Sequence, residues 1–172
     1  AQVIGKQLIL TYDQDASNKA YICHLDGKDI KEIKLPAIGS VGFSGNRDDK
    51  ECFYSFTSFT QPGSTYTFDI EKNESLLYRS PQIDFDSDKF ITQQLFFESK
   101  DGTQIPMFIT HKKGLELNSN NPVYLYGYGG FNISLNPSFS VSRLPFLEQG
   151  GIYAQVNLRG GGEYGEDWHI AG

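Results

Sequence analysis

The first half of the chain consists of short runs in which apolar and polar residues alternate, separated by turn residues. Runs rich in aromatic and β-branched residues and bounded by Asp, Asn, Ser or Gly are typical of β-strands. Turn sequences such as Asp13–Asn18 and Asp26-Gly27 separate the first three runs. The strands predicted in this half are Leu8–Tyr12, Ala20–Leu25, Ile30–Leu35, Ile38–Phe43, Cys52–Phe59, Thr65–Ile70 and Leu76–Tyr78.

The strand pattern of the first half occurs twice, with a shift of about 45 residues. This shift places Tyr21 on Tyr66 and Ile33 on Tyr78. A repeat of roughly 40–50 residues with about four strands is typical of a β-propeller blade. One pair of repeats also leaves open a plain antiparallel meander.

The pattern changes near Ile83. The segments Ile91–Glu98 and Thr103–Thr110 flank Lys100-Asp101-Gly102, which indicates a hairpin. Pro106 within the second of these strands indicates an edge position, because proline cannot donate to a neighbouring strand.

Two later runs are apolar on both faces, as the buried strands of an α/β sheet are. They are Val123–Tyr126 and Gly151–Leu158, and each is followed by a glycine-rich loop. Between them, Ser138–Gln149 predicts a short helix that Pro145 interrupts. The predicted fold is therefore mixed, with antiparallel strands arranged as partial β-propeller blades or as a meander in residues 1–82 and an α/β domain in residues 83–172.

Composition excludes several classes of function. The net charge is -6 and no Lys/Arg cluster occurs, so we expect no nucleic-acid partner. No apolar run reaches the ~20 residues of a membrane span, and Ala1–Thr11 is not a signal peptide. Cys23 and Cys52 lie in apolar runs and are expected to be buried free thiols, which favours a reducing compartment. The three histidines are far apart, so neither a metal site nor a cofactor is expected.

Both ends of the chain suggest a piece of a longer protein. The sequence begins at Ala1 rather than Met, and it stops at Gly172 just after a glycine-rich turn where a helix is expected. We therefore expect further sequence on both sides.

The glycine loop Gly160–Gly165 formally matches G-x-G-x-x-G after a strand. A dinucleotide site would also need a following helix, a second strand and an acidic residue ~20 positions further on. Glu163 would place a carboxylate where a pyrophosphate should bind, so this interpretation is disfavoured.

The other glycine loop, Gly127–Phe131, surrounds Tyr128 with three glycines. A tight turn at the end of a buried strand can lift Tyr128 into the crevice at the carboxyl edge of the sheet, where α/β enzymes bind ligands. Its phenol could donate a hydrogen bond to an oxyanion there. The alternative is that Tyr128 fills the space that the glycines leave.

Three motifs resemble the prolyl oligopeptidase family of serine peptidases. Tyr126–Ile133 resembles the family's strand-end loop, and Arg159–Gly165 with Trp168-His169 resembles its next motif. Phe97–Pro106 resembles the start of its hydrolase domain, and residues 1–82 are similar to the last blades of its propeller. The resemblance covers the whole chain and is strongest over residues 95–172.

The resemblance implies a seven-bladed propeller joined to an α/β-hydrolase domain, with the active site between them and a Ser-Asp-His triad that cleaves short peptides after proline. It implies that Tyr128 helps to hold the oxyanion and that Phe131 lines the proline-side pocket. Arg159 and Glu163 are expected to form an ion pair that closes the second glycine loop. It further implies proline-containing peptides as partners, a monomeric parent protein and a cytoplasmic location.

The chain departs from the family in one respect. No G-x-S-x-G motif occurs in the 172 residues, so the triad serine, aspartate and histidine are expected beyond Gly172 and the chain alone is expected to be inactive. Asp167 and His169 are read as a helix-start residue and a structural or exposed side chain. The alternatives are a related oligopeptidase specific for basic residues, a propeller-derived module that binds peptides without cutting them, and an inert pseudo-domain.

Overall fold

The structure, a computed structural model, describes all residues from 1 to 172. The chain divides into two compact units. The first comprises Ala1–Ile83 with Pro137–Phe139, and the second comprises Asp84–Asn136 with Ser140–Gly172. Residues 137–139 join the first unit through hydrogen bonds from Ser40 Oγ to Pro137 O (2.8 Å) and from Phe139 N to Thr57 Oγ1 (3.3 Å).

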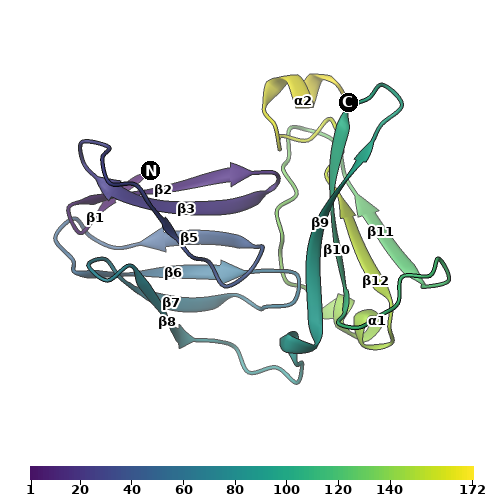
Figure 1. The fold of residues 1–172 in the computed structure, drawn as a ribbon, viewed down its shortest axis with the longest axis horizontal. Coiled ribbons are helices and arrows are strands. Elements are labelled where there is room, and N and C mark those ends of the chain that lie inside the picture. Colours follow the sequence, from purple (N-terminus) through teal and green to yellow (C-terminus); the bar gives the residue numbers. More distant parts are fainter. The chain divides into compact units, whose positions relative to one another are not determined.

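The first unit consists of two four-stranded antiparallel sheets (Figure 1). In each sheet the strands pair in the order in which they follow along the chain, as they do in a propeller blade. The first sheet contains β1 (Gln2–Ile4), β2 (Gln7–Gln14), β3 (Ser17–His24) and β4 (Lys31–Ile33), and the second contains β5 (Ser40–Ser44), β6 (Glu51–Thr57), β7 (Ser64–Asp69) and β8 (Glu74–Arg79).

Strand alternation builds a core that both sheets share. Alternate residues of each sheet, among them Ile22 and Phe56, are buried in one cluster. Within it the rings of Tyr54 and Tyr66 are stacked with their centroids 5.0 Å apart. The repeat predicted from sequence agrees with this arrangement, because Tyr21 and Tyr66 both lie in the third strand of their sheets.

The second unit contains a mixed four-stranded sheet in the order β11-β12-β10-β9. The β9–β10 and β10–β12 pairs are antiparallel, whereas β11 and β12 run parallel. The helices are short, and none has the length and apolar character needed to cross a membrane. The elements are 3₁₀ turns at Ser87–Lys89 and Val141–Arg143, β9 (Phe90–Glu98), β10 (Gln104–Lys112), β11 (Val123–Gly127), α1 (Leu144–Glu148), β12 (Ile152–Val156) and α2 (Glu166–Ile170).

The predicted edge position of Pro106 is wrong, because β10 lies inside the sheet between β9 and β12. The ladder with β12 begins only at Met107, and beyond it Asn157 N donates to Pro106 O at 3.0 Å. The N–H and C=O of one strand residue point to the same side. The N–H that proline lacks would therefore have faced Asn157, which lies just past the end of β12, so no bond within the β10–β12 ladder is lost.

The predicted burial of Val123–Tyr126 is also wrong. All residues of β11 are exposed, because β11 is an edge strand that pairs only with β12 in this chain. β12 shows the burial that both runs were expected to have, since every residue of Ile152–Val156 is buried. The two runs thus share their apolar pattern, and of the two only β12 has a strand on each side within these 172 residues.

The two cysteines are free and buried, as predicted. Burial raises the pKa of the Cys52 thiol to about 11, and the nearby carboxylates Asp49 and Glu51 raise it further. A thiol with so high a pKa forms little thiolate at neutral pH, which makes it a poor nucleophile. Cys52 therefore behaves as a core residue of the first unit.

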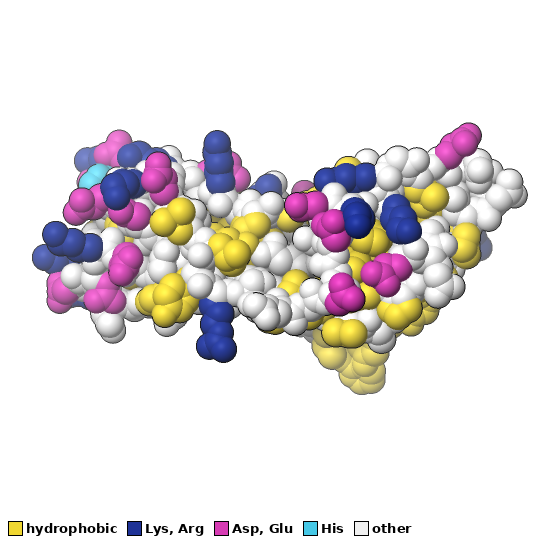
Figure 2. Space-filling view, turned by 90° about the horizontal axis from the view of Figure 1, so that it is seen from below, with side chains coloured by type: hydrophobic (Ala, Val, Ile, Leu, Met, Phe, Trp, Pro, Cys, Tyr) yellow, Lys and Arg dark blue, Asp and Glu magenta, His cyan; other side chains and the backbone are white.

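Charged side chains of both signs are interspersed on the face that Figure 2 shows, with hydrophobic groups between them. No broad area of that face carries basic groups alone.

Candidate functional site in the glycine loops of the second unit

Tyr128 lies in the loop that follows β11, at the carboxyl end of a parallel strand. Its side chain is 48% exposed, and its hydroxyl makes no hydrogen bond within the chain. A packing role would require a buried ring, so the observed exposure favours a phenol that is available to an external acceptor. In open α/β sheets, ligands bind outside the carboxyl ends of the strands, which is where this loop lies.

The loop is held by a close approach between the two glycine segments. Gly129 (φ +62°) lies so near Leu158 and Arg159 that an added Cβ would stand 2.6 Å from Leu158 Cβ. A Cβ on Gly160 (φ +93°) would stand only 2.3 Å from Gly129 O. Both positions require a left-handed backbone and no side chain, which only glycine provides without strain. The glycines of the second motif therefore support the loop of the first.

Phe131 presents an aromatic ring from a strained backbone. Its φ is +55° and that of Asn132 is +56°, a conformation that is a genuine outlier for a bulky residue. The ring is 83% exposed and lies 6.4 Å from the ring of Tyr128, centroid to centroid. Strain of this kind persists only where the surroundings enforce it, and it is concentrated at functional sites. The two residues singled out from the sequence thus lie side by side on one surface.

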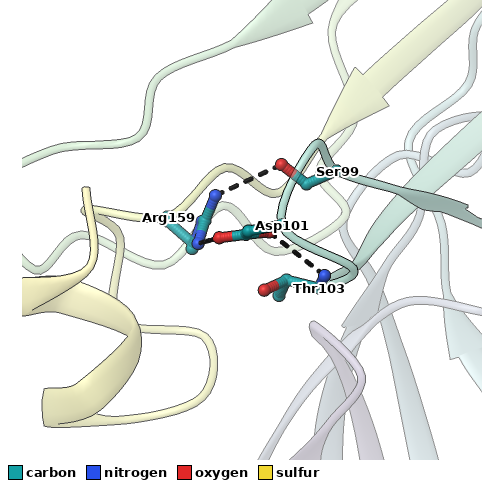
Figure 3. Close-up of polar contacts among 4 residues, drawn as sticks. All are labelled: Ser99, Asp101, Thr103 and Arg159. Atoms are coloured by element: carbon teal, nitrogen blue, oxygen red, sulfur yellow. Dashed lines mark hydrogen bonds and ion pairs between the residues drawn. The ribbon is translucent and has the colours of Figure 1, made fainter.

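Arg159 has a different partner from the one predicted. It bonds to the carboxylate of Asp101 and donates from Nη2 to Ser99 Oγ at 3.2 Å (Figure 3). Thr103 N donates to the same carboxylate, at 3.1 Å from Asp101 Oδ1. The expected Arg159–Glu163 ion pair is therefore wrong, because Arg159 turns outward to the β9–β10 turn while Glu163 is buried. Arg159 thereby fastens that turn to the segment after β12.

The Arg159 guanidinium holds the pKa of Asp101 at about 2, and the Thr103 hydrogen bonds act in the same direction. Because this is below the ordinary value of about 3.9, the pair stabilises the fold above about pH 4 and loses that effect as the pH falls toward 2. We expect Asp101→Asn to lower the melting temperature at pH 7, with the difference from wild type shrinking toward pH 3. The control Glu116→Gln removes an exposed carboxylate that has no ion pair. An Asp101→Asn deficit that stays constant across this pH range would contradict the assignment.

The structure also contains a buried polar cluster that the sequence did not lead us to predict. Gln155, Asn157 and Glu163 are all buried and converge on the backbone of Leu135. The signal was a polar residue at every second position of an otherwise apolar run, Tyr153, Gln155 and Asn157.

The remaining candidates have structural positions. Asp167 lies in the first turn of α2, and His169 Nδ1 donates to Gly160 O at 2.9 Å. No group of three or more His, Cys, Asp or Glu side chains is arranged to hold a metal ion. Tyr128 and Phe131 therefore stay the candidate site residues of the second unit.

Comparison with known protein families matches both parts of the chain. The prolyl oligopeptidase N-terminal β-propeller domain matches residues 1–81, and the prolyl oligopeptidase family, peptidase S9, matches residues 137–172. The first match agrees with a partial propeller built from the two four-stranded sheets of the first unit.

Individual proteins of the same family are similar to nearly the whole chain. The prolyl endopeptidase of Elizabethkingia miricola is 46% identical over 169 residues, which cover 98% of this chain and 24% of that protein. The prolyl endopeptidase of Dictyostelium discoideum is 40% identical over 171 residues, which cover 97% of this chain and 22% of that protein. The solved structure of apo prolyl oligopeptidase B from Galerina marginata aligns with a TM-score of 0.90 at 31% identity, over 100% of this chain and 26% of that one.

The chain thus spans about a quarter of the length of the curated relatives it matches. Its similarity to them extends across both units, and the order of the two family matches is the order of the two units along the chain. The chain belongs to the prolyl oligopeptidase family.

Proposed function

We propose that this chain is part of a serine endopeptidase that hydrolyses short peptides on the carboxyl side of proline. The second unit is then the start of an α/β-hydrolase domain, which the parallel β11–β12 pair and the family match at residues 137–172 support. The observation that carries the proposal is an unbonded, half-exposed Tyr128 hydroxyl beside the exposed ring of Phe131.

In this proposal the nucleophile comes from a part of the protein outside these 172 residues. A serine hydroxyl adds to the peptide carbonyl, a histidine takes its proton, and the carbonyl oxygen becomes an oxyanion. The Tyr128 hydroxyl donates a hydrogen bond to that oxygen, and the bond strengthens as negative charge develops. Collapse of the adduct expels the amine, which takes the proton from the histidine.

Phe131 provides contact for the proline side chain. Proline is compact and apolar, and a flat ring offers it contact area without a polar group that would have to be desolvated. Its 83% exposure leaves most of the ring available for such contact. Relatives in this family have been solved with peptides, among them Galerina marginata prolyl oligopeptidase B with a 25mer macrocyclization substrate, which supports peptides as the substrate class.

The specificity is tested with the full-length protein and two fluorogenic peptides that differ only in Pro or Arg before the cleaved bond. We expect cleavage after proline, with kcat/KM for the arginine peptide lower by about 100-fold or more, since an apolar pocket leaves the guanidinium unpaired. Preference for arginine would favour the basic-specific alternative. Binding of the proline peptide without cleavage would favour a non-catalytic module.

The role of Phe131 is tested with Phe131→Ala in the same protein. Because burying a Phe contact contributes about 1.5–3 kcal/mol, kcat/KM for the proline peptide should fall by about 10–100-fold. The ring is exposed in this chain, so the melting temperature should change by less than about 2 °C. A variant with unchanged kinetics would exclude Phe131 from the substrate pocket.

A further inference from the structure

Strand β12 carries polar side chains on a buried face. Ile152, Ala154 and Val156 point into apolar clusters, whereas Tyr153, Gln155 and Asn157 take the alternate positions. The exposed fractions of these polar residues are 2%, 3% and 0%. A polar group that loses water must find a partner within the protein, so the partners of this face indicate what it is for.

The partners of Gln155 and Asn157 converge on the backbone of one residue, Leu135, while the Tyr153 hydroxyl donates to Gln155 Oε1 at 3.2 Å. Asn157 Nδ2 donates to Leu135 O at 2.8 Å, and Gln155 Nε2 donates to the same oxygen at 3.1 Å. Leu135 N donates to Glu163 Oε1 at 2.9 Å. Leu135 lies outside all helices and strands, so these side chains take the place of a neighbouring strand.

The Glu163 carboxylate is buried between Leu135, Asn157 and Gly161. Its side chain is 9% exposed, and its Oε1 also accepts from Asn157 Nδ2 at 3.1 Å. A Cβ on Gly161 would stand 2.1 Å from Glu163 Oε2 and 2.9 Å from Ile133 O, so Gly161 packs closely against the carboxylate and the neighbouring backbone. Oε2 has no hydrogen-bond partner within the chain, so Oε1 makes the contacts of this carboxylate.

Further hydrogen bonds connect the segment between Leu135 and the candidate site to the second glycine loop and to itself. Leu135 is four residues beyond Phe131, and in between Asn132 N donates to Gly160 O at 3.1 Å and Ile133 N donates to Gly130 O at 3.1 Å. The segment is thus tied to residues 157–163 at Asn132 and again at Leu135, directly after the strained position 131. A strained backbone is kept only where such contacts over-determine it.

We propose that Glu163, Asn157 and Gln155 are positioning residues, which hold the N–H and the C=O of Leu135 and thereby fix the loop that presents Phe131 to the substrate. This inference rests on the proposed function, because the loop has a substrate to meet only in a peptidase. These residues do not touch the substrate themselves. They act through the backbone between Asn132 and Leu135.

The test compares Glu163→Ala with Glu163→Gln in the full-length protein. Alanine removes the acceptor for Leu135 N. Glutamine keeps an oxygen at the same place and should therefore keep the hydrogen bond from Leu135 N. The control Glu148→Ala truncates an exposed glutamate at the end of α1. Rates are expressed per active site titrated with a serine-reactive organophosphate, so that unfolded protein does not enter the comparison.

We expect Glu163→Ala to raise KM for the proline peptide about tenfold, the effect of losing about 1.4 kcal/mol of binding, with kcat within about twofold. Hydrogen exchange in the peptide covering residues 130–136 should accelerate about tenfold or more, while that in β12 stays protected. Glu163→Gln and Glu148→Ala should match wild type. If Glu163→Ala does not fold, Gln155→Met provides a second test, because it removes one of the two donors to Leu135 O. Gln155→Met should also raise KM and leave kcat nearly unchanged, with a smaller rise in KM.

Unchanged KM and exchange in the folded variants would overturn the positioning role. So would a lower melting temperature with unchanged KM, which describes a merely structural residue. If the wild-type protein binds or ignores the peptide without cleaving it, the proposed function fails, and this inference fails with it. If the wild-type protein cleaves the peptide normally and Glu163→Ala leaves KM unchanged, the positioning inference is refuted and the proposed function stands.

Discussion

Replacing Tyr128 with phenylalanine in the full-length protein is expected to lower kcat by about 10²–10³, the usual effect of removing one oxyanion donor. The substitution removes one oxygen from a half-exposed side chain whose hydroxyl makes no bond within the chain. Nothing in the fold therefore depends on that oxygen, and the melting temperature should not change. The loss should appear in kcat rather than KM, because the hydroxyl meets full negative charge only in the transition state.

Steady-state kinetics on the proline peptide measure this directly. A second tyrosine serves as a control, because Tyr164 is also exposed and lies in the other glycine loop. Tyr164→Phe should retain wild-type kcat. An unchanged kcat in Tyr128→Phe would return Tyr128 to a role in packing, whereas equal losses in both variants would point to a general disturbance of the loops.

Replacing Gly160 with alanine is expected to give the largest loss of stability among the substitutions considered. Its left-handed backbone costs about 1–2 kcal/mol for any residue with a Cβ, and overpacking adds typically about 1–3 kcal/mol. The steric part arises because the new Cβ would meet Gly129 O at 2.3 Å, and a carbonyl of the backbone cannot rotate away.

Gly150→Ala separates the two contributions. Gly150 has a similar φ of +89°, but an added Cβ would meet no atom within 4 Å. The free energy of local opening, measured by hydrogen exchange across β11 and β12, should therefore fall further in Gly160→Ala than in Gly150→Ala. Equal losses would show that the two glycine segments do not pack as closely as described.

Local patterns in the sequence predicted the elements that depend on near neighbours. The hairpin around Asp101-Gly102, seven of the eight strands of the first unit and the loop carrying Tyr128 all lie where alternation and glycines placed them. β1 was not predicted, because it has only three residues and its turn uses Gly5-Lys6, with positive φ at both. A lysine at φ +60° does not match the Asn-Gly or Asp-Gly signal of such turns.

The contacts that position the site could not be read from the sequence. Arg159 and Asp101 are 58 residues apart, and Glu163 and Leu135 are 28 residues apart. Such pairs follow from the strand order, in which β10 separates β9 from β12, and no local pattern encodes that order. The nearby Glu163 was therefore a reasonable but wrong partner for Arg159. The roles of Tyr128 and Phe131 stay predictions that the kinetic experiments decide.

A structure of the full-length protein with a bound peptide aldehyde tests the central claim most directly. An aldehyde in place of the proline carboxyl group would accept the catalytic serine and leave a tetrahedral oxygen where the oxyanion forms. We predict that Tyr128 Oη lies about 2.7–3.1 Å from that oxygen, with the ring of Phe131 against the pyrrolidine. A Tyr128 hydroxyl turned away from the adduct, with other groups bonding its oxygen, would contradict the account.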